Sequence, residues 1–263
     1  VVVVSRNRAV EFRRCLEAIE ACDGRANYQV IAVDNGSTDG SALLIDEFPN
    51  VQFIRLPKNF GLTKALNLGW RAADAEYVLF LHDDTIVQPA AVRILADALD
   101  NRAEAAAVCP LLVDSQGHPS PQLGTLPPDG IWRPAQPGAP SEVEYARGAA
   151  IMYRVYFIKA LRQIDERYGQ FGADADLAAE IRRANRKIVL LPAAVVQHEA
   201  RSEYSAVEKA DFLNARAVYL GKHQGTVAGL QARLGAVLGP LGGFRFGELK
   251  HTIGAQKIDG TQE

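Results

Sequence analysis

The sequence has few cysteines, no long apolar run and no excess of charge of one sign. Its three cysteines (Cys15, Cys22 and Cys109) have neither the spacing of a zinc site nor the even count of a disulfide framework. A reduced, cytoplasmic setting is therefore expected. The longest apolar stretches, such as residues 188–196, are about half as long as the roughly 18 residues that a membrane span requires. No transmembrane segment is predicted.

The charges nearly balance, since 29 lysines and arginines face 31 aspartates and glutamates, for a formal net charge of −2. No basic field is available to attract nucleic acid, so a nucleic-acid partner is not expected. A hydrophobic content of 48% and a charged content of 23% are ordinary globular values. The composition thus argues against a disordered chain, a nucleic-acid binder and a small disulfide scaffold.

Two glycine-rich phosphate motifs are also missing. The sequence contains no Gly-x-Gly-x-x-Gly fingerprint and no Gly-Lys-Ser/Thr phosphate loop. Both motifs bring backbone N–H groups against phosphates at the start of a helix. Their absence counts against dinucleotide oxidoreductases and nucleoside triphosphatases.

The first half of the chain alternates strand and helix signals. Short β-branched or apolar runs occupy residues 1–4, 28–33, 51–56 and 77–81, and helical spacing of apolar residues occupies 10–21, 42–47 and 62–73. Short buried strands that alternate with helices are typical of βαβ units and a parallel sheet. We predict an α/β fold.

The second half is less regular. Residues 115–140 contain seven prolines and four glycines and are predicted to form a long irregular loop. The strands expected around it are 105–113, 143–152, 188–191 and 194–198, and the helices are 156–161, 174–184 and 207–220.

The tail from residue 225 has a different pattern. Residues 226–238 place Val227, Leu230, Leu234 and Val237 along one helical face, and glycines between 239 and 247 predict its end. Packing on the domain is one interpretation, and a homodimer or a membrane surface is another. We therefore divide the chain into 1–113, 114–224 and a helical tail, 225–263.

Polar residues follow the expected strands where each strand ends. Ser5 and Asn7 follow the first strand, Asp34 the second and Asp83 the fourth. A strand order of 3-2-1-4 would bring these ends together, and ligands of such sheets bind beyond the carboxyl ends of the strands.

The adjacent carboxylates of Asp83 and Asp84 suit a hard divalent cation that is shared with substrate phosphates. A solvated turn that caps the next helix explains the same two residues. Asp34 is equally open to a nucleotide contact or to simple turn chemistry with the Asn-Gly-Ser that follows it.

The motifs taken in order resemble the family-2 glycosyltransferases. Residues 1–8 resemble the opening strand of that family, and Asp34-Asn35-Gly36-Ser37 lies within a close match to its signature. The later matching blocks are Asn59-x-Gly61 with Asn67-x-Gly69, residues 79–85, 147–150 and 164–168, Asp174-x-Asp176 with Arg182, and residues 191–198. The resemblance covers roughly residues 1–200, and the bacterial rhamnosyltransferase-like branch is nearest.

The resemblance implies a GT-A (Rossmann-like) fold, in which helices flank a central, mostly parallel sheet. It also implies inverting transfer of a sugar from a nucleotide donor (a UDP-, dTDP- or GDP-sugar) to a hydroxyl group, assisted by Mg²⁺ or Mn²⁺. The acceptor is expected to be a glycan or lipid-linked glycan in cell-surface polysaccharide synthesis. Such a protein would work in the cytoplasm, or peripherally at the inner face of the cell membrane.

Roles follow residue by residue from the same resemblance. Asp34 would contact the nucleobase, and Asn59 would line the nucleotide pocket. Asp84 would bind the metal, His198 would be a further metal ligand or phosphate contact, and Asp174 would be the general base. The other expected nucleotide-binding residues are Ser5, Asn7, Asn35, Ser37 and Asp83.

Two positions depart from the family pattern. Ala173 stands where a partner acid of Asp174 is common, and His82 stands where Asp or Asn is common. Asp174 could instead cap a helix, and His198 could be an ordinary polar residue at a strand end. These departures keep open a catalytically degenerate module that binds a nucleotide sugar or a glycan. A sugar nucleotidylyltransferase is a further alternative, although such enzymes usually carry a glycine-rich, basic loop after the first strand and residues 5–8 of this chain contain no glycine.

Overall fold

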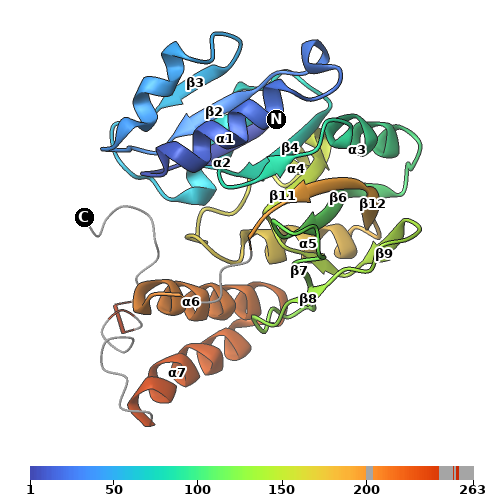
Figure 1. The fold of residues 1–263 in the computed structure, drawn as a ribbon. Coiled ribbons are helices and arrows are strands. Elements are labelled where there is room, and N and C mark those ends of the chain that lie inside the picture. The colour runs from blue at the N-terminus through green and yellow to red at the C-terminus, as the bar shows by residue number, and fades with distance from the viewer. Residues whose placement is uncertain (200–203, 243–250, 252, 255–263) are drawn as a thin grey trace.

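A central sheet flanked by helices forms the body of the protein, as the computed structural model shows (Figure 1). The structure describes residues 1–199, 204–242, 251, 253 and 254. The strands are β1 (Val2–Ser5), β2 (Ile31–Asp34), β3 (Gln52–Arg55), β4 (Tyr77–His82), β5 (Ile86–Val87), β6 (Ala105–Val113), β7 (Pro121–Gly124), β8 (Arg133–Pro134), β9 (Ser141–Val143), β10 (Tyr145–Ala146), β11 (Ala150–Arg154) and β12 (Lys187–Gln197). The helices are α1 (Ala9–Glu20), α2 (Leu62–Ala72), α3 (Ala91–Asp100), α4 (Val155–Ala160), α5 (Ala173–Arg183), α6 (Ala206–His223) and α7 (Thr226–Gly242), with short 3₁₀ helices η1 (Arg25–Asn27) and η2 (Gly40–Asp46).

The large sheet has the strand order β3-β2-β1-β4-β11-β6-β12-β5, and β9 pairs with β12 at its side. The first four strands are parallel, which confirms the predicted 3-2-1-4 order. β11 lies antiparallel between β4 and β6, and β12 runs parallel to β6. The carboxyl ends of β1, β2 and β4 therefore meet at one edge of the sheet.

Side chains of the buried strands alternate between two hydrophobic cores. Val2 and Val4 belong to the core that includes residues of α2, α4 and α5. Val3, between them, belongs to the other core with residues of α1 and α3. Because successive strand residues point to opposite faces, a sheet covered on both sides needs apolar residues at every position. The continuous valine run at the start of the chain meets this need.

The second half differs from the expectation in several places. The 115–140 loop contains β7 and β8, which pair with β10 in a small antiparallel sheet. The single strand expected at 143–152 is divided into the end of β9, then β10 and β11, because these segments pair with different partners. Conversely, 188–191 and 194–198 join in one strand, β12. A register shift between Leu191 and Val195 leaves Pro192 outside the ladder, where its missing N–H is not needed. The helix expected at 42–47 is the 3₁₀ helix η2.

α7 folds back on α6, and Figure 1 shows the two helices side by side. α7 meets α6 through small residues: a Cβ at Gly229 would lie 2.7 Å from the Cα of Gly221. Val227, Leu230 and Leu234 are exposed and Val237 is half-buried, so most of the apolar face predicted from the sequence points away from the domain. The glycines between 239 and 247 were predicted to end this helix, but α7 continues to Gly242. Residues 243–247 lie outside the described residues.

Within the described ranges, no helix combines the length and the apolarity that crossing a membrane requires.

Close contact between α2 and β1 generates a stability prediction. A Cβ at Gly69 would lie 2.4 Å from Cγ1 of Val2. Gly69→Ala should lower the free energy of unfolding by about 1–3 kcal/mol, as overpacked cores do. The control is Gly235→Ala in α7, where nothing lies within 4 Å of the added carbon, and stability should be unchanged or raised by at most about 1 kcal/mol. Urea unfolding measures both. Equal losses in the two variants would contradict the packing argument.

Candidate active site

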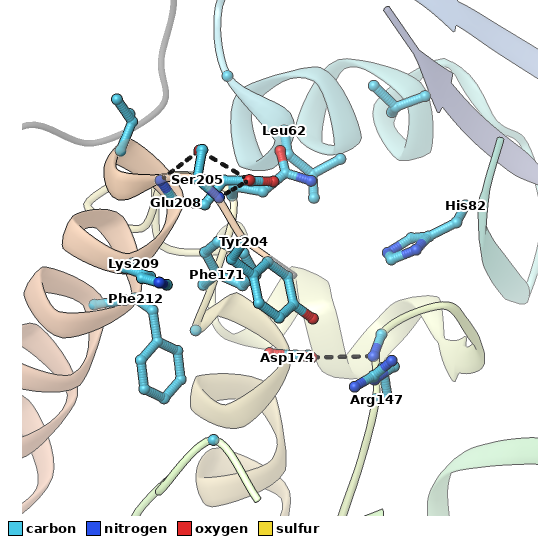
Figure 2. Close-up of a pocket in the computed structure, with 18 of the residues that line it drawn as sticks. Leu62, His82, Arg147, Phe171, Asp174, Tyr204, Ser205, Glu208, Lys209 and Phe212 are labelled. Carbon is cyan, nitrogen blue, oxygen red and sulfur yellow. Dashed lines mark hydrogen bonds between the residues drawn. The ribbon is translucent and has the colours of Figure 1, made fainter. Parts of the chain in front are cut away.

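A cavity of about 850 Å³ opens at the carboxyl ends of β1 and β4 and extends to α5 and α6 (Figure 2). Seven of the ten predicted site residues line it. They are Ser5, Asn35, Asn59, Asp83, Asp84, Asp174 and His198. The cavity therefore brings together predicted site residues that are up to 193 positions apart in the sequence, namely Ser5 and His198.

Asn7, Asp34 and Ser37 lie beside the cavity and are not among its lining residues in the described structure. Asn7 donates its backbone N–H to Ser37 Oγ at 3.0 Å and accepts from the N–H of Thr38 at 2.7 Å. Asp34 Oδ1 accepts from the N–H of Ser37 at 2.9 Å, whereas its buried Oδ2 has no hydrogen-bond partner among the described residues and lies 4.0 Å from Nε of Arg55. These residues hold together the loops that follow β1 and β2, and one oxygen of Asp34 is left for a ligand.

Asn35 and Asn59 organise the loop before α2. Asn35 Nδ2 donates to Asn59 Oδ1 at 3.0 Å, and that oxygen also accepts from the N–H of Gly61 at 2.8 Å. Gly36, with φ of 75°, brings the two loops into contact, because a Cβ there would lie 2.3 Å from the carbonyl carbon of Lys58. The sequence indicates a turn at Asn35-Gly36. The glycine is also needed because the loop after β2 passes very close to the loop before α2.

The two aspartates after β4 share an arginine. Arg8 Nη1 lies 3.2 Å from Asp83 Oδ1 and 3.1 Å from Asp84 Oδ2. Ser5 Oγ donates to Asp83 Oδ2 at 2.8 Å. Burial raises the pKa of Asp83 to about 6, although Arg8 and Ser5 oppose the shift. Burial also acts to raise the pKa of Asp84, but His82, His198 and Arg8 outweigh it, and that pKa is lowered.

Two histidines complete this end of the cavity. The ligand atoms of His82, Asp84 and His198 all lie within 4.8 Å of one another, and His198 Nε2 is 3.5 Å from Asp84 Oδ1. Burial lowers the pKa of both imidazoles, that of His82 to about 4, so both rings are neutral near pH 7. Asp84 Oδ1 and His198 Nδ1 are buried without a hydrogen-bond partner in the described structure. Neutral imidazoles and a carboxylate with unused lone pairs are the donors that a divalent cation needs.

Asp174 lies across the cavity in the first turn of α5. Tyr145 donates its hydroxyl to Asp174 Oδ1 at 2.9 Å, and the N–H of Gly148 donates to Oδ2 at 3.0 Å, as Figure 2 shows for the second bond. Burial raises the pKa of Asp174, and the Tyr145 hydrogen bond is the largest opposing effect. Ala173 occupies the position where a partner acid is expected. The carboxylate of Asp174 is oriented instead by the hydroxyl group of Tyr145, a residue of β10.

Aromatic side chains form the remaining wall. Trp132 packs on Tyr145 with ring centroids 4.9 Å apart, and the guanidinium of Arg147 lies 4.7 Å from the Trp132 ring. On the other side, Phe171 contacts the rings of Tyr204 and Phe212 edge to face (Figure 2). The sequence assigned no role to Trp132 or to the start of α6. The proline-rich character of residues 115–140 was the only sequence signal that pointed to the region of Trp132. No sequence signal pointed to the start of α6.

A second group of acids, outside the cavity, links α5 to α6. Asp176 Oδ2 lies 2.8 Å from Lys222 Nζ, and Asp176 Oδ1 lies 2.7 Å from His223 Nε2. Lys222 Nζ is also 3.4 Å from Glu180 Oε1. Because the Lys222 ammonium group bridges the carboxylates of Asp176 and Glu180, the group is an ionic link between two helices.

Solved structures with the same architecture define the class of the fold. GalNAc-T7 with UDP, GalNAc and Mn²⁺ superposes with a TM-score of 0.68 and 15% identity, over 83% of this chain and 46% of that chain. The chain thus spans less than half of GalNAc-T7. The mannosyltransferase PcManGT from Pyrobaculum calidifontis, in complex with GDP-Man and Mn²⁺, superposes with a TM-score of 0.63 and 15% identity. This match covers 97% of this chain and 72% of that chain. The fold is that of the GT-A glycosyltransferases.

The sequence comparison gives the family. Residues 1–161 match the family described as glycosyl transferase family 2, and the chain belongs to that family. It is 27% identical over 235 residues to the N-acetylglucosaminyl-diphospho-decaprenol L-rhamnosyltransferase of Mycobacterium tuberculosis, a match that covers 77% of this chain and 76% of the relative. This match supports the rhamnosyltransferase-like branch that the motifs indicated.

Proposed function

We propose that this glycosyltransferase moves a sugar, with inversion, from a nucleotide-diphosphate donor to a hydroxyl group of a glycan acceptor carried on a lipid. The observation that carries this proposal is the cavity itself. An oriented, buried carboxylate, that of Asp174, faces a His-Asp cluster across this cavity, beside the carboxyl ends of the parallel strands. These are the parts that a single displacement on a nucleotide sugar requires.

The donor lies at the ends of β1 and β2 in this proposal. The buried Oδ2 of Asp34, which accepts no hydrogen bond in the described structure, can accept one from an N–H of a nucleobase. Asn35 and Asn59 line the cavity beside it, and the arrangement does not select among UDP, dTDP and GDP. The remaining proposed nucleotide contacts are Ser5, Asn7, Ser37 and Asp83. The mycobacterial relative is named for L-rhamnosyl transfer, so a deoxyhexose is the donor sugar to test first.

His82, Asp84 and His198 would hold a divalent cation beside the donor diphosphate. When bound, such a cation acts as a Lewis acid that neutralises charge developing on the departing nucleotide. Arg8, which already bridges Asp83 and Asp84, adds a positive charge at the same place.

Asp174 is the proposed general base. The acceptor hydroxyl oxygen forms a bond to the anomeric carbon as the bond from that carbon to the diphosphate oxygen breaks on the opposite face. The hydroxyl proton passes to Asp174, and the nucleoside diphosphate leaves with the bonding electron pair. Because attack and departure occur on opposite faces, the configuration inverts and no glycosyl-enzyme intermediate forms. Tyr145 and Gly148 hold the carboxylate in position for the transfer.

The acceptor lies against the aromatic wall in this proposal. Trp132, Phe171, Tyr204 and Phe212 line the cavity on the side of Asp174, and sugar rings pack well on aromatic faces. The relative acts on an acceptor named as a diphospho-decaprenol, which is a lipid-linked glycan. A protein that used such an acceptor would work at a membrane surface.

The exposed apolar face of α7 supports peripheral membrane contact. Val227, Leu230, Leu234 and Leu238 are all more than half exposed and recur at helical spacing. α7 packs against α6, and α6 lines the cavity. An apolar helix face inserted in a bilayer interface would therefore lie close to the site that receives a lipid-linked acceptor.

Asp174→Asn tests the reaction. We expect kcat to fall by a factor of about 100 or more, because the variant cannot accept the proton, while the dissociation constant of the donor stays within twofold. Asp46→Asn, at an exposed position on η2, is the matched control and should keep full activity. Turnover is measured with UDP-, dTDP- and GDP-sugars and donor binding by calorimetry. Normal turnover of Asp174→Asn would refute the base assignment. Donor binding by the wild type with no turnover of any donor would favour a degenerate binding module.

Tyr145→Phe tests how the base is held. The Tyr145 hydroxyl lowers the pKa of Asp174, so its removal should raise that pKa. Since Asp174 must be ionised to act, the acidic limb of the kcat–pH profile should move to higher pH, and activity should be lost over a wider acidic range. The control is Tyr153→Phe, a neighbour in the same hydrophobic core. An unchanged acidic limb in Tyr145→Phe would show that the hydrogen bond does not tune the base.

The double variant Leu230→Gln/Leu234→Gln tests the membrane contact. Its binding to vesicles of phosphatidylethanolamine and phosphatidylglycerol should weaken at least fivefold in co-sedimentation, because two apolar side chains leave the inserted face. The control is Leu43→Gln/Ile45→Gln, which removes two exposed apolar residues from η2 and should not change vesicle binding. If the wild type does not bind vesicles but forms dimers in sedimentation equilibrium, the membrane contact is overturned and α7 instead joins two copies of the chain.

A further inference from the structure

We infer that His82 converts the cation site of this chain into one with two imidazoles and one carboxylate, which selects a first-row transition-metal ion such as Mn²⁺ over Mg²⁺. The inference rests on the proposed function, because it concerns the cation that would assist the donor. It goes further in assigning a metal preference to the site and in attributing that preference to His82.

Geometry supplies the first argument. His82 ends β4, Asp84 follows two residues later, and His198 comes directly after β12. β4 and β12 are separated in the sheet by β11 and β6, yet the rings of His82 and His198 have centroids only 5.4 Å apart. The ligand atoms of the three residues fall within 4.8 Å of one another, close enough for one ion to contact all three.

The unused polar atoms supply the second argument. His198 is 5% exposed, and its Nδ1 has no hydrogen-bond partner in the described structure. Oδ1 of Asp84 is buried and unpartnered in the same way, and it faces His198 Nε2 at 3.5 Å. A buried polar atom without a partner costs free energy, so the arrangement is stabilised when a ligand occupies it.

Asp83 is not available as a second carboxylate ligand of the cation. Its Oδ2 accepts from Ser5 at 2.8 Å and its Oδ1 lies 3.2 Å from Arg8. Both oxygens are therefore committed on the side of β1. A cation between the two histidines would have one protein carboxylate, two nitrogen ligands and the oxygens of the donor diphosphate.

Ligand chemistry then sets the preference. Mg²⁺ takes oxygen ligands in near-ideal octahedral geometry and gives up water reluctantly. Imidazole nitrogen is a softer donor that suits first-row transition metals, whose affinity for nitrogen ligands rises from Mn²⁺ along the series. Replacing one aspartate of an Asp-x-Asp pair by His82 removes a hard, charged ligand that Mg²⁺ depends on and retains a good ligand for Mn²⁺.

Metal binding tests the inference without any turnover. The probe is Mn²⁺, titrated into the wild type with saturating UDP, GDP or dTDP, with free Mn²⁺ read from its electron paramagnetic resonance signal. Mg²⁺ is then added to compete. We expect Mg²⁺ to bind at least tenfold more weakly than Mn²⁺ with at least one nucleotide. Equal affinities, or no Mn²⁺ binding with any nucleotide, would overturn the inference.

Three variants then assign the preference to His82. His82→Asn should weaken Mn²⁺ binding at least tenfold, and His82→Asp should reduce the ratio of Mn²⁺ to Mg²⁺ affinity at least fivefold by restoring a hard ligand. His118→Asn is the matched control, because His118 is exposed and lies beside Asp114 away from the cavity. Urea unfolding checks that each variant is folded. A His82 variant that is folded and keeps the wild-type ratio would refute the ligand role.

Co²⁺ provides a spectroscopic readout of the ligands. Its visible absorption with the wild type and nucleotide should change in position and intensity in His82→Asp and remain unchanged in His118→Asn. This result does not depend on sugar transfer. If transfer fails in every assay while the Mn²⁺ preference and the spectrum hold, the metal assignment stands and the proposed reaction does not. If transfer proceeds equally well with Mg²⁺ and Mn²⁺ and the affinities are equal, the reaction stands and the metal assignment fails.

Discussion

Parallel pairing of β1 with β2 and β4 is the constraint on which the rest of the site depends. In a parallel sheet all strands end at the same edge, so the polar residues after each strand must share that edge. Backbone register places Ser5 opposite Asp34 on one side and Val4 opposite His82 on the other. The apolar strands stabilise the sheet, and this stability is what holds several carboxylates close together despite their mutual repulsion.

Electrostatic compensation makes that concentration of acids tolerable. Arg8 lies between Asp83 and Asp84, the two histidines stay neutral because of burial, and Asp174 accepts bonds from Tyr145 and a backbone N–H. Each charge is therefore met by a donor or a cation held by a different segment. The same contacts leave Asp84 Oδ1 unsatisfied, so compensation is incomplete at the point where a cation would bind.

The side of the cavity formed by α5 and α6 depends on a different interaction. Asp176, two residues after Asp174, is 2% exposed and is bonded to Lys222 and His223 near the end of α6. Asp211 of α6 accepts from the backbone N–H groups of Gln170 and Phe171. Breaking a buried, paired charge is costly, so α6 and the segment before α5 form one unit with α5, the helix that carries Asp174. The aromatic wall is thus held in a defined place relative to Asp174.

Sequence reasoning found the parallel half of the sheet, its strand order and seven cavity residues, because each depends on short-range patterns. A buried strand must be apolar, and the residue that follows it must be polar wherever a ligand binds. It missed the divided strands around Tyr145 and the single strand through Pro192, since pairing partners far along the chain decide where a strand stops. It treated His82 only as a departure, because nothing local to β4 shows that His198 lies beside it. The α/β class and the glycosyltransferase motifs were determined by the sequence alone. The tertiary structure decided which residues meet: Tyr145 with Asp174, His82 with His198, and the start of α6 with the cavity. These segments are distant in sequence, and they come close only once the cores on both faces of the sheet are packed.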